Sequence, residues 1–310
     1  MFVIDPSRPI LVYLANGVQG GAVVRAALRR GFKVRAMVRN RARSGALAEL
    51  GVELAEGDLS DAASLRAASA GVAHAVIQIP VGPESQMCAR AGNALSASRA
   101  CGLTSVVLKL ASASRPAPCA EPSFVANAMI EGMVRESGLP FAIVRPTLYL
   151  DNLLKPSARA EILEHGVFAP PIAASQRIAW TSADDCAEAA VTLLEQGVDG
   201  GDHRIAGPDS LTGDELAERI AAGLGRSVIY RAQPLDEFER DIDAAMGPGS
   251  GQRVASRFRY LATHPHEAEA ILAAPFESQS GLEHFRPSDV ETWVRQHRKD
   301  FLESPGSTAA

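Results

Sequence analysis

The stretch from Leu11 to Gly21, LVYLANGVQGG, decides how the N-terminal half of this chain folds. It joins an apolar run, Ile10 to Leu14, to a segment with helical spacing, Gly21 to Arg30, through a turn that contains Gly17 and Gly20. A strand that leads through glycines into a helix directs backbone N–H groups and the positive helix end at a phosphate. Small residues let that phosphate approach the backbone. The stretch therefore predicts a phosphate-binding loop, with a merely tight turn as the alternative.

Strand and helix signals alternate through the first half of the sequence. The expected strands after the first are Lys33–Arg39, Val52–Ala55, Ala73–Gln78, Ser105–Leu110 and Phe141–Val144, and the expected helices after the first are Asp61–Ala70, Ser85–Ala100 and Ser123–Ser137. This alternation predicts βαβ units and a parallel sheet. We therefore expect an α/β fold with a doubly wound, Rossmann-type sheet over residues 1–150, completed by residues from about 180 to 205.

Helical patterns dominate the second half of the sequence. Residues 151–310 are expected to form a smaller, mostly helical lobe that binds a substrate or a partner, and residues 304–310 a disordered tail. Two pairs have the spacing of a capping box and predict helix starts. They are Thr212 with Glu215 and Ser288 with Glu291.

Composition and charge argue against two classes of protein. The chain has 310 residues, 46% of them hydrophobic, and a net charge of −5, whereas a general nucleic-acid binder carries a basic face. No apolar run reaches the roughly 20 residues of a membrane helix, and the N-terminus lacks the pattern of a secretory signal. The four cysteines form no CxxC pair, which suits reduced thiols. We expect a cytoplasmic monomer or homodimer that binds no nucleic acid, membrane or metal.

The residues after the second expected strand indicate which nucleotide binds. An acidic residue there would accept the ribose hydroxyls of NAD, but the sequence has Arg39, followed by Arg41 and Arg43. Positive charge at this position suits a 2′-phosphate and favours NADP(H), with a solvated basic turn as the alternative. In the loop itself, Leu14 stands where such a turn usually has its first glycine. Its side chain must point away from the phosphates or it will crowd them.

Several segments, in their order along the chain, resemble the NmrA-like group of atypical short-chain dehydrogenases/reductases. They are LVYLANGVQGGAVV from Leu11, FKVRAMVRN from Phe32, GDLSD from Gly57, ESGLPFAIVRPTLYLDNLL from Glu136, IAWTSADDCAEAA from Ile178, and the segment from Glu291 to Phe301. The resemblance implies a Rossmann domain, a smaller helical lobe and NADP(H) in the cleft between them. It covers nearly the whole chain and does not specify the reaction.

The resemblance also implies roles for residues at matching positions. Asn16, Gly17, Val18, Gln19 and Gly20 stand at the positions of the family's pyrophosphate-binding loop. Arg39 and Arg43 stand at positions that bind the 2′-phosphate. The adenine contact matches Asp58 and Leu59, although a plain helix-capping turn is an equal alternative, and the ribose wall matches Gln78, Ile79 and Pro80. The nicotinamide end matches Tyr149, Leu150, Asp151 and Asn152, and a substrate contact matches His165.

The residue pair of active short-chain dehydrogenases is missing from this sequence. In those enzymes a Tyr donates a proton to the carbonyl, and a Lys four residues later lowers its pKa. The residues four positions after Tyr13, Tyr149, Tyr230 and Tyr260 are Gly17, Leu153, Pro234 and His264. Many relatives keep the Lys where this chain has Asn127, which could still bind a ribose. Ser112 could bind a substrate, with a purely structural serine as the favoured alternative, and Tyr149 is the third catalytic candidate.

Three functions are compatible with this pattern. The first is an NAD(P)H-dependent reductase of a quinone, azo compound or enone, because hydride transfer to such acceptors needs mostly positioning. The second is a non-catalytic regulator that senses NADP(H) and binds a protein partner. The third is a non-redox enzyme on a repurposed Rossmann scaffold, which would follow if Leu14 abolished nucleotide binding.

Overall fold

The computed structural model describes residues 8–302, which form two compact units. The first unit comprises the residues up to Pro146, Ala183–Ile205 and Glu277–Phe285, and the second comprises Thr147–Ser182, Ala206–Phe276 and the residues from Arg286 on. The chain therefore passes between the units several times. The division expected from the sequence did not include Glu277–Phe285 in the first unit. The expected tail, residues 304–310, lies outside the described residues.

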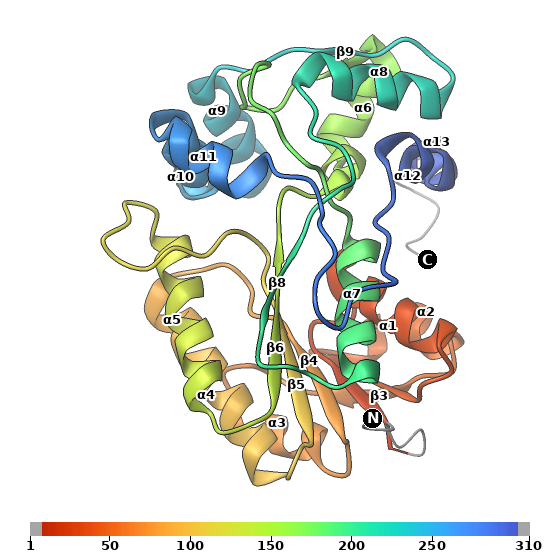
Figure 1. The fold of residues 1–310 in the computed structure, drawn as a ribbon, viewed down its shortest axis with the longest axis vertical. Helices are drawn as coiled ribbons and strands as arrows, with labels where there is room; N and C mark the ends of the chain where they lie inside the picture. Colours follow the sequence, from red (N-terminus) through yellow and green to blue (C-terminus); the bar gives the residue numbers. More distant parts are fainter. Residues whose placement is uncertain (1–7, 303–310) are drawn as a thin grey trace. The chain divides into compact units, whose positions relative to one another are not determined.

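The first unit is built on a seven-stranded sheet in which neighbouring strands are parallel (Figure 1). Its strands are β1 (Ile10–Val12), β2 (Val34–Val38), β3 (Glu53–Glu56), β4 (His74–Ile77), β5 (Ser105–Lys109), β6 (Phe141–Pro146) and β8 (Asp202–Ile205). They lie in the order β3-β2-β1-β4-β5-β6-β8, which reverses between β1 and β4. Ligands of doubly wound sheets bind at such a reversal, beyond the carboxyl ends of the strands. The expected fold class is confirmed.

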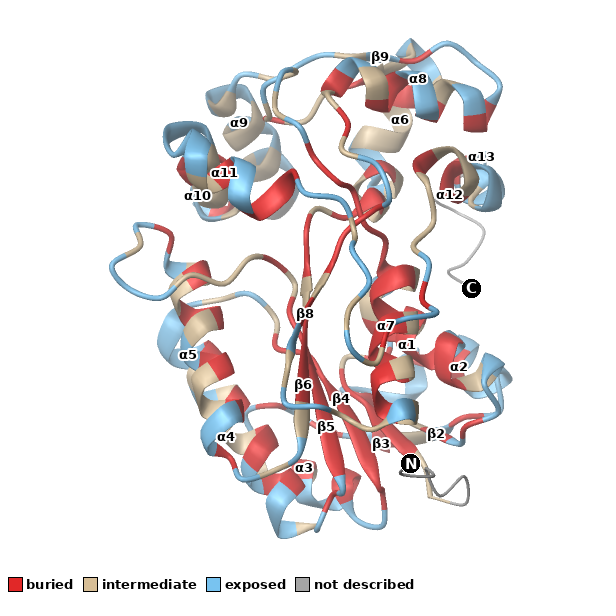
Figure 2. Ribbon diagram, in the orientation of Figure 1, coloured by how far each residue is buried: buried red, intermediate tan, exposed pale blue. Residues whose placement is uncertain are grey.

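Helices cover both faces of this sheet, because connections between parallel strands must cross over it. On one face α1 (Val18–Arg29) packs against α7 (Ala183–Gln196), and on the other α3 (Ala62–Ser69), α4 (Glu84–Ala100) and α5 (Pro122–Glu136) pack in series. Two short helices, η1 (Arg41–Arg43) and α2 (Gly45–Glu49), follow β2. Strands β1, β4 and β5 are buried along their whole length (Figure 2).

The second unit is mostly helical, as the sequence predicted. Its helices are η2 (Leu150–Leu154), α6 (Pro156–His165), α8 (Gly213–Leu224), α9 (Leu235–Met246), α10 (Ser250–Thr263), α11 (Pro265–Leu272), α12 (Val290–Gln296) and α13 (Arg298–Leu302). Strands β7 (Val167–Phe168) and β9 (Ile229–Tyr230) form a small parallel sheet. The Phe168 ring packs edge-on against Trp180 and Tyr230, with centroids 6.3 and 6.0 Å apart. No helix within residues 8–302 is both long and apolar enough to cross a membrane.

The two expected capping boxes have different outcomes. Thr212 caps α8 and exchanges hydrogen bonds with Glu215, so the first prediction is confirmed. The second prediction is wrong, because Asp289 rather than Ser288 is the N-cap of α12, and its carboxylate accepts the N–H of Thr292 at 2.8 Å. Asp and Ser are about equally good caps, so the helix could begin one residue later than predicted, with Asp289 as its cap.

Helix α1 begins earlier than the sequence predicted. Strand β1 ends at Val12 rather than Leu14, and α1 begins at Val18 rather than Gly21. The earlier start follows from Gly17, which already has the extended backbone of an N-cap. The predicted phosphate loop is therefore shorter than the sequence suggests, and its last residues form the first helical turn.

The turn between β1 and α1 brings two backbone segments into close contact. A Cβ on Gly20 would lie 2.2 Å from the carbonyl oxygen of Leu14, so only glycine lets the helix pack against the turn. Leu14 has a φ of +53°, a left-handed conformation that costs a bulky residue on the order of 1–2 kcal/mol. Its half-buried side chain packs against the hydrophobic core. This side chain is therefore directed into the protein.

We predict that Gly20→Ala lowers the free energy of unfolding by about 2 kcal/mol, because the added methyl group meets backbone atoms that cannot yield without moving α1. The measurement is equilibrium unfolding in urea. Gly21→Ala is the matched control, since its Cβ would lie an ordinary 3.5 Å from its nearest neighbours. Alanine is also the better helix former by up to about 1 kcal/mol, so this control should be at least as stable as the wild type. Equal losses in both variants would contradict the role of the close approach.

Candidate functional site

The first turn of α1 presents N–H groups that no helical carbonyl accepts. Gly17 caps the helix, and a 2.7 Å hydrogen bond runs from the Gly21 N–H to the Gly17 carbonyl oxygen. The N–H groups of Val18, Gln19 and Gly20 therefore have no partner within the helix. They stand at the positive end of the helix dipole, at the carboxyl edge of a parallel sheet. This arrangement is suited to bind a pyrophosphate.

Three side chains from neighbouring segments hold this loop in place. Asn16 Nδ2 donates to Ser44 Oγ at 2.7 Å, Gln78 Nε2 to the Tyr13 carbonyl oxygen at 3.1 Å, and Lys109 Nζ to Gln19 Oε1 at 2.6 Å. Lys109 ends β5 and Gln78 directly follows β4, while Ser44 lies beyond β2. The loop is thus fixed to the ends of β4 and β5 and to the segment after β2, at the sheet edge where the sequence predicted the nucleotide.

Arg39 and Arg43 lie on the turn after β2 with exposed side chains. Within residues 8–302 neither guanidinium has a protein partner. Arg41 differs, because its guanidinium donates to the Leu54 carbonyl oxygen at 2.7 Å and is tied to β3. Two exposed guanidinium groups beside an anion-binding helix end fit a nucleotide that carries a 2′-phosphate. The residues of this edge therefore fit NADP(H).

The segment of Asp58 and Leu59 forms a tight turn before α3. The exposed Asp58 carboxylate accepts the Ser60 N–H at 2.7 Å, and Asp61 is the N-cap of α3. The Leu59 side chain is buried in the core. The geometry is that of the capping turn, which leaves one face of the Asp58 carboxylate to solvent. An adenine contact of these residues stays a prediction.

The residues expected at the ribose follow β4 directly. Gln78 and Ile79 are buried and Pro80 is half-buried. The Gln78 amide nitrogen already donates to the Tyr13 carbonyl oxygen, so this side chain supports the loop. A contact of Gln78, Ile79 or Pro80 with the ribose stays a prediction.

The structure brings Asn127 and Ser112 together. Asn127 Nδ2 donates to Ser112 Oγ at 3.1 Å and to the Ala113 carbonyl oxygen at 2.8 Å. Both side chains are buried, so α5 anchors the loop that follows β5. An amide in this position carries no charge and cannot lower the pKa of a neighbouring phenol as a lysine does. The roles of these two residues toward ribose and substrate remain predictions.

The residues expected at the nicotinamide end belong to the second unit. Tyr149 is buried and forms a β-bridge with Thr181. Leu150 is fully buried, and Asp151 and Asn152 are half-buried in η2. His165, the predicted substrate contact, is an exposed residue at the end of α6. The contacts predicted for these five residues with nicotinamide or substrate remain predictions.

Two of the four tyrosines are unsuited to donate a proton to a substrate. Tyr13 is fully buried beneath the loop, and burial raises the pKa of its phenol to about 12. Tyr230 donates to the Ile172 carbonyl oxygen at 2.8 Å, and burial raises its pKa as well. Neither phenol is a candidate for the role that Tyr has in active short-chain dehydrogenases.

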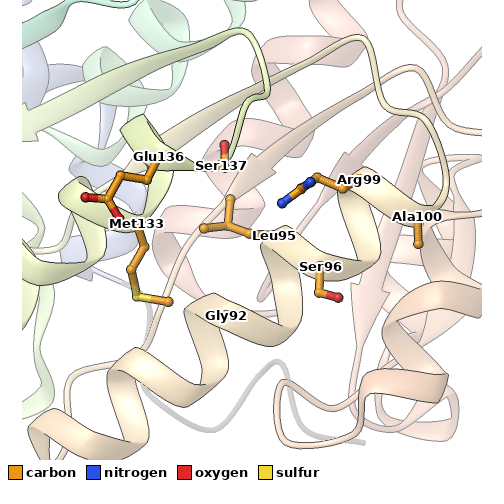
Figure 3. A pocket seen from close by; sticks show the side chains of 8 residues that line it. All are labelled: Gly92, Leu95, Ser96, Arg99, Ala100, Met133, Glu136 and Ser137. Carbon is orange, nitrogen blue, oxygen red and sulfur yellow. The ribbon is translucent and has the colours of Figure 1, made fainter.

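A hollow of about 620 Å³ lies between the C-terminal halves of α4 and α5 (Figure 3). Leu95 and Arg99 from α4 and Met133 and Glu136 from α5 are among its lining residues. Because α4 and α5 end where β5 and β6 begin, this hollow lies toward the amino edge of the sheet. None of the predicted site residues lines it, and it is separate from the loop at the carboxyl edge.

Sequence reasoning missed two residues that support the loop. Ser44 had no signal, because its partner Asn16 is 28 residues away and serine is common in turns. Lys109 did leave a signal, since it is a charged residue within the apolar run SVVLKL. A lysine is almost never fully buried without a partner, and its position in a strand could have drawn attention to the end of β5.

Comparisons with known proteins agree with this architecture. The model of the NmrA-like family matches residues 6–298. NAD(P)H azoreductase of Xenophilus azovorans is 30% identical over 255 residues, which cover 81% of this chain and 85% of that protein. Quinone oxidoreductase 2 of Escherichia coli (strain K12) is 29% identical over 236 residues, 75% of this chain and 79% of its own length.

A solved structure extends the likeness to the whole fold. Citrobacter sp. triphenylmethane reductase complexed with NADP(H) superimposes with a TM-score of 0.75 at 22% identity, over 93% of this chain and 99% of that one. The family match, the identity with the azoreductase and the doubly wound sheet agree with one another. The chain belongs to the NmrA-like family.

Proposed function

We propose that this chain is an NAD(P)H-dependent reductase of an electrophilic small molecule of quinone, azo or enone type, with NADPH as its preferred donor. The observation that carries the proposal is a pair of exposed guanidinium groups, Arg39 and Arg43, which have no partner in the described part of the chain and lie beside the first turn of α1. Relatives whose names are NAD(P)H azoreductase and quinone oxidoreductase 2 support the same class of acceptor.

The side chains and backbone of the loop would hold the nucleotide in three places. Arg39 and Arg43 bind the 2′-phosphate, the N–H groups of the first turn of α1 bind the pyrophosphate, and Asp58 receives the adenine end. When bound, NADPH supplies a hydride, so that a quinone gains that hydride and one proton from water to become a hydroquinone while NADP⁺ is left. The chain contributes position rather than a proton donor, because no Tyr–Lys pair is present in its sequence.

Three further groups of residues would contact the nucleotide or the acceptor. Tyr149 to Asn152 would meet the nicotinamide end, Asn127 the ribose, and Ser112 and His165 the acceptor. The protein would act in the cytoplasm as a monomer or homodimer on a small molecule. Binding of NADP(H) without turnover of any acceptor would instead favour a sensing role with a protein partner.

We predict that Arg39→Ala weakens NADP⁺ binding roughly 10- to 100-fold and leaves NAD⁺ binding nearly unchanged. The reason is the loss of a charge-assisted hydrogen bond to the 2′-phosphate, worth about 1.5–3 kcal/mol. The measurement is a calorimetric titration of both nucleotides. Arg99→Ala is the matched control, because it removes the same charge from an exposed arginine at the hollow near the opposite sheet edge. An equal effect of Arg39→Ala on both nucleotides would refute the 2′-phosphate role.

A second prediction concerns turnover. Oxidation of NADPH, followed by its absorbance, should be fast with quinones, azo dyes or enones and on the order of 100-fold slower, or slower still, with simple ketones. A ketone needs general acid catalysis, which contributes about 10²- to 10⁴-fold when a donor is present. If NADPH is oxidised no faster than background with every electrophilic acceptor, the reductase proposal is contradicted. Comparable rates with ketones would show that a proton donor exists elsewhere in the site.

A further inference from the structure

Lys109 is a buried charge at the end of a central strand. It is the last residue of β5, and its side chain is only 1% exposed. Val106 and Leu108 belong to the core cluster on the α4 and α5 side of the sheet. Since side chains alternate along a strand, Lys109 points to the opposite face, where α1 and α7 pack. A charged group in this position loses its hydration, and the protein must offer partners in return.

The ammonium of Lys109 reaches the predicted pyrophosphate loop. Its Nζ donates to Gln19 Oε1 at 2.6 Å, and Gln19 is the second residue of α1. An ammonium can donate but cannot accept, so the Gln19 amide must turn its oxygen toward Lys109. The NH₂ group of Gln19 is then directed away from the lysine. This one hydrogen bond therefore fixes the directions of both the oxygen and the NH₂ group of the Gln19 amide.

We propose that Lys109 is a positioning residue for the pyrophosphate of the nucleotide. Its ammonium holds the Gln19 amide so that the NH₂ group joins the backbone N–H groups of the first turn of α1 as a phosphate donor. Its charge also lies directly behind that turn, where the low dielectric of the interior weakens electrostatic interactions less than water does. The inference rests on the proposed nucleotide binding and adds a residue to which the family resemblance gave no role.

The surroundings of Lys109 determine which variants can test the proposal. Helix α7 packs against β5 and carries a second buried charge, Asp185, in its first turn. Lys109→Met removes the ammonium that donates to the Gln19 amide oxygen, so this variant is expected to lose stability as well as affinity. Gln19→Leu changes a half-buried residue of the loop and leaves every buried charge in place. The second variant therefore removes the same hydrogen bond from the loop side, with the ammonium of Lys109 still present.

The experiment measures dissociation constants for two ligands that share only part of the site. NADP⁺ contains the pyrophosphate, and adenosine 2′-phosphate lacks it but retains the group that Arg39 would bind. Lys109→Met and Gln19→Leu should each weaken NADP⁺ about tenfold, the loss expected for one charge-assisted contact. Both should leave adenosine 2′-phosphate binding unchanged. The double variant should bind NADP⁺ no more weakly than the weaker single variant, because both substitutions remove one coupled unit.

Each outcome decides one claim. A wild type that binds neither ligand overturns the proposed function itself. If Gln19→Leu and Lys109→Met bind NADP⁺ as tightly as the wild type does, the proposed role of Lys109 is overturned. Equal weakening of both ligands also overturns it, because the lysine would then serve only the structure. Lys33→Met is the charge control, since Lys33 is exposed and precedes β2 at the opposite edge of the sheet.

Discussion

The approach of Gly20 to the carbonyl oxygen of Leu14 sets the geometry of the whole carboxyl edge. Because no Cβ separates them, α1 begins directly after the turn, and its first N–H groups point into the space beyond the carboxyl ends of the strands. Asn16 and Gln19 then come within reach of Ser44 and Lys109. The left-handed backbone of Leu14 belongs to the same constraint. Its strain, on the order of 1–2 kcal/mol, is offset by packing of its side chain against the core.

The sheet was predictable because each of its features leaves a local mark in the sequence. Strands buried on both faces are continuous apolar runs, and Gly31, Gly71 and Gly138, all with positive φ, follow three of the helices. Features that depend on distant partners left no such mark. No sequence feature near Ser44 predicts its hydrogen bond with Asn16, and no local pattern assigns Glu277–Phe285 to the first unit. The prediction of the α12 cap failed for a different reason, because two adjacent residues, Ser288 and Asp289, could both cap the helix and only the backbone decided between them.

The candidate site divides its charges between two environments. Arg39 and Arg43 are exposed and have no guanidinium partner among residues 8–302, so in the proposed function they select a nucleotide that carries a 2′-phosphate. Lys109 is buried and acts on the loop through Gln19, so it orients groups that touch the ligand. Asn127 is neutral and holds the loop after β5. Such a site is suited to place two reactants and is poorly suited to donate protons to them.

The interleaving of the two units affects how the chain is made and how it can evolve. Strands β6 and β8 are neighbours in the sheet, yet Thr147–Ser182 of the second unit is synthesised between them. During translation, one edge of β6 therefore stays exposed until β8 emerges from the ribosome. The unpaired backbone groups of this edge can form hydrogen bonds with strands of other chains. The second unit is also encoded by three separate segments of the gene and not by one continuous segment. Recombination at two points therefore cannot exchange the second unit, as one continuous segment, for that of another protein.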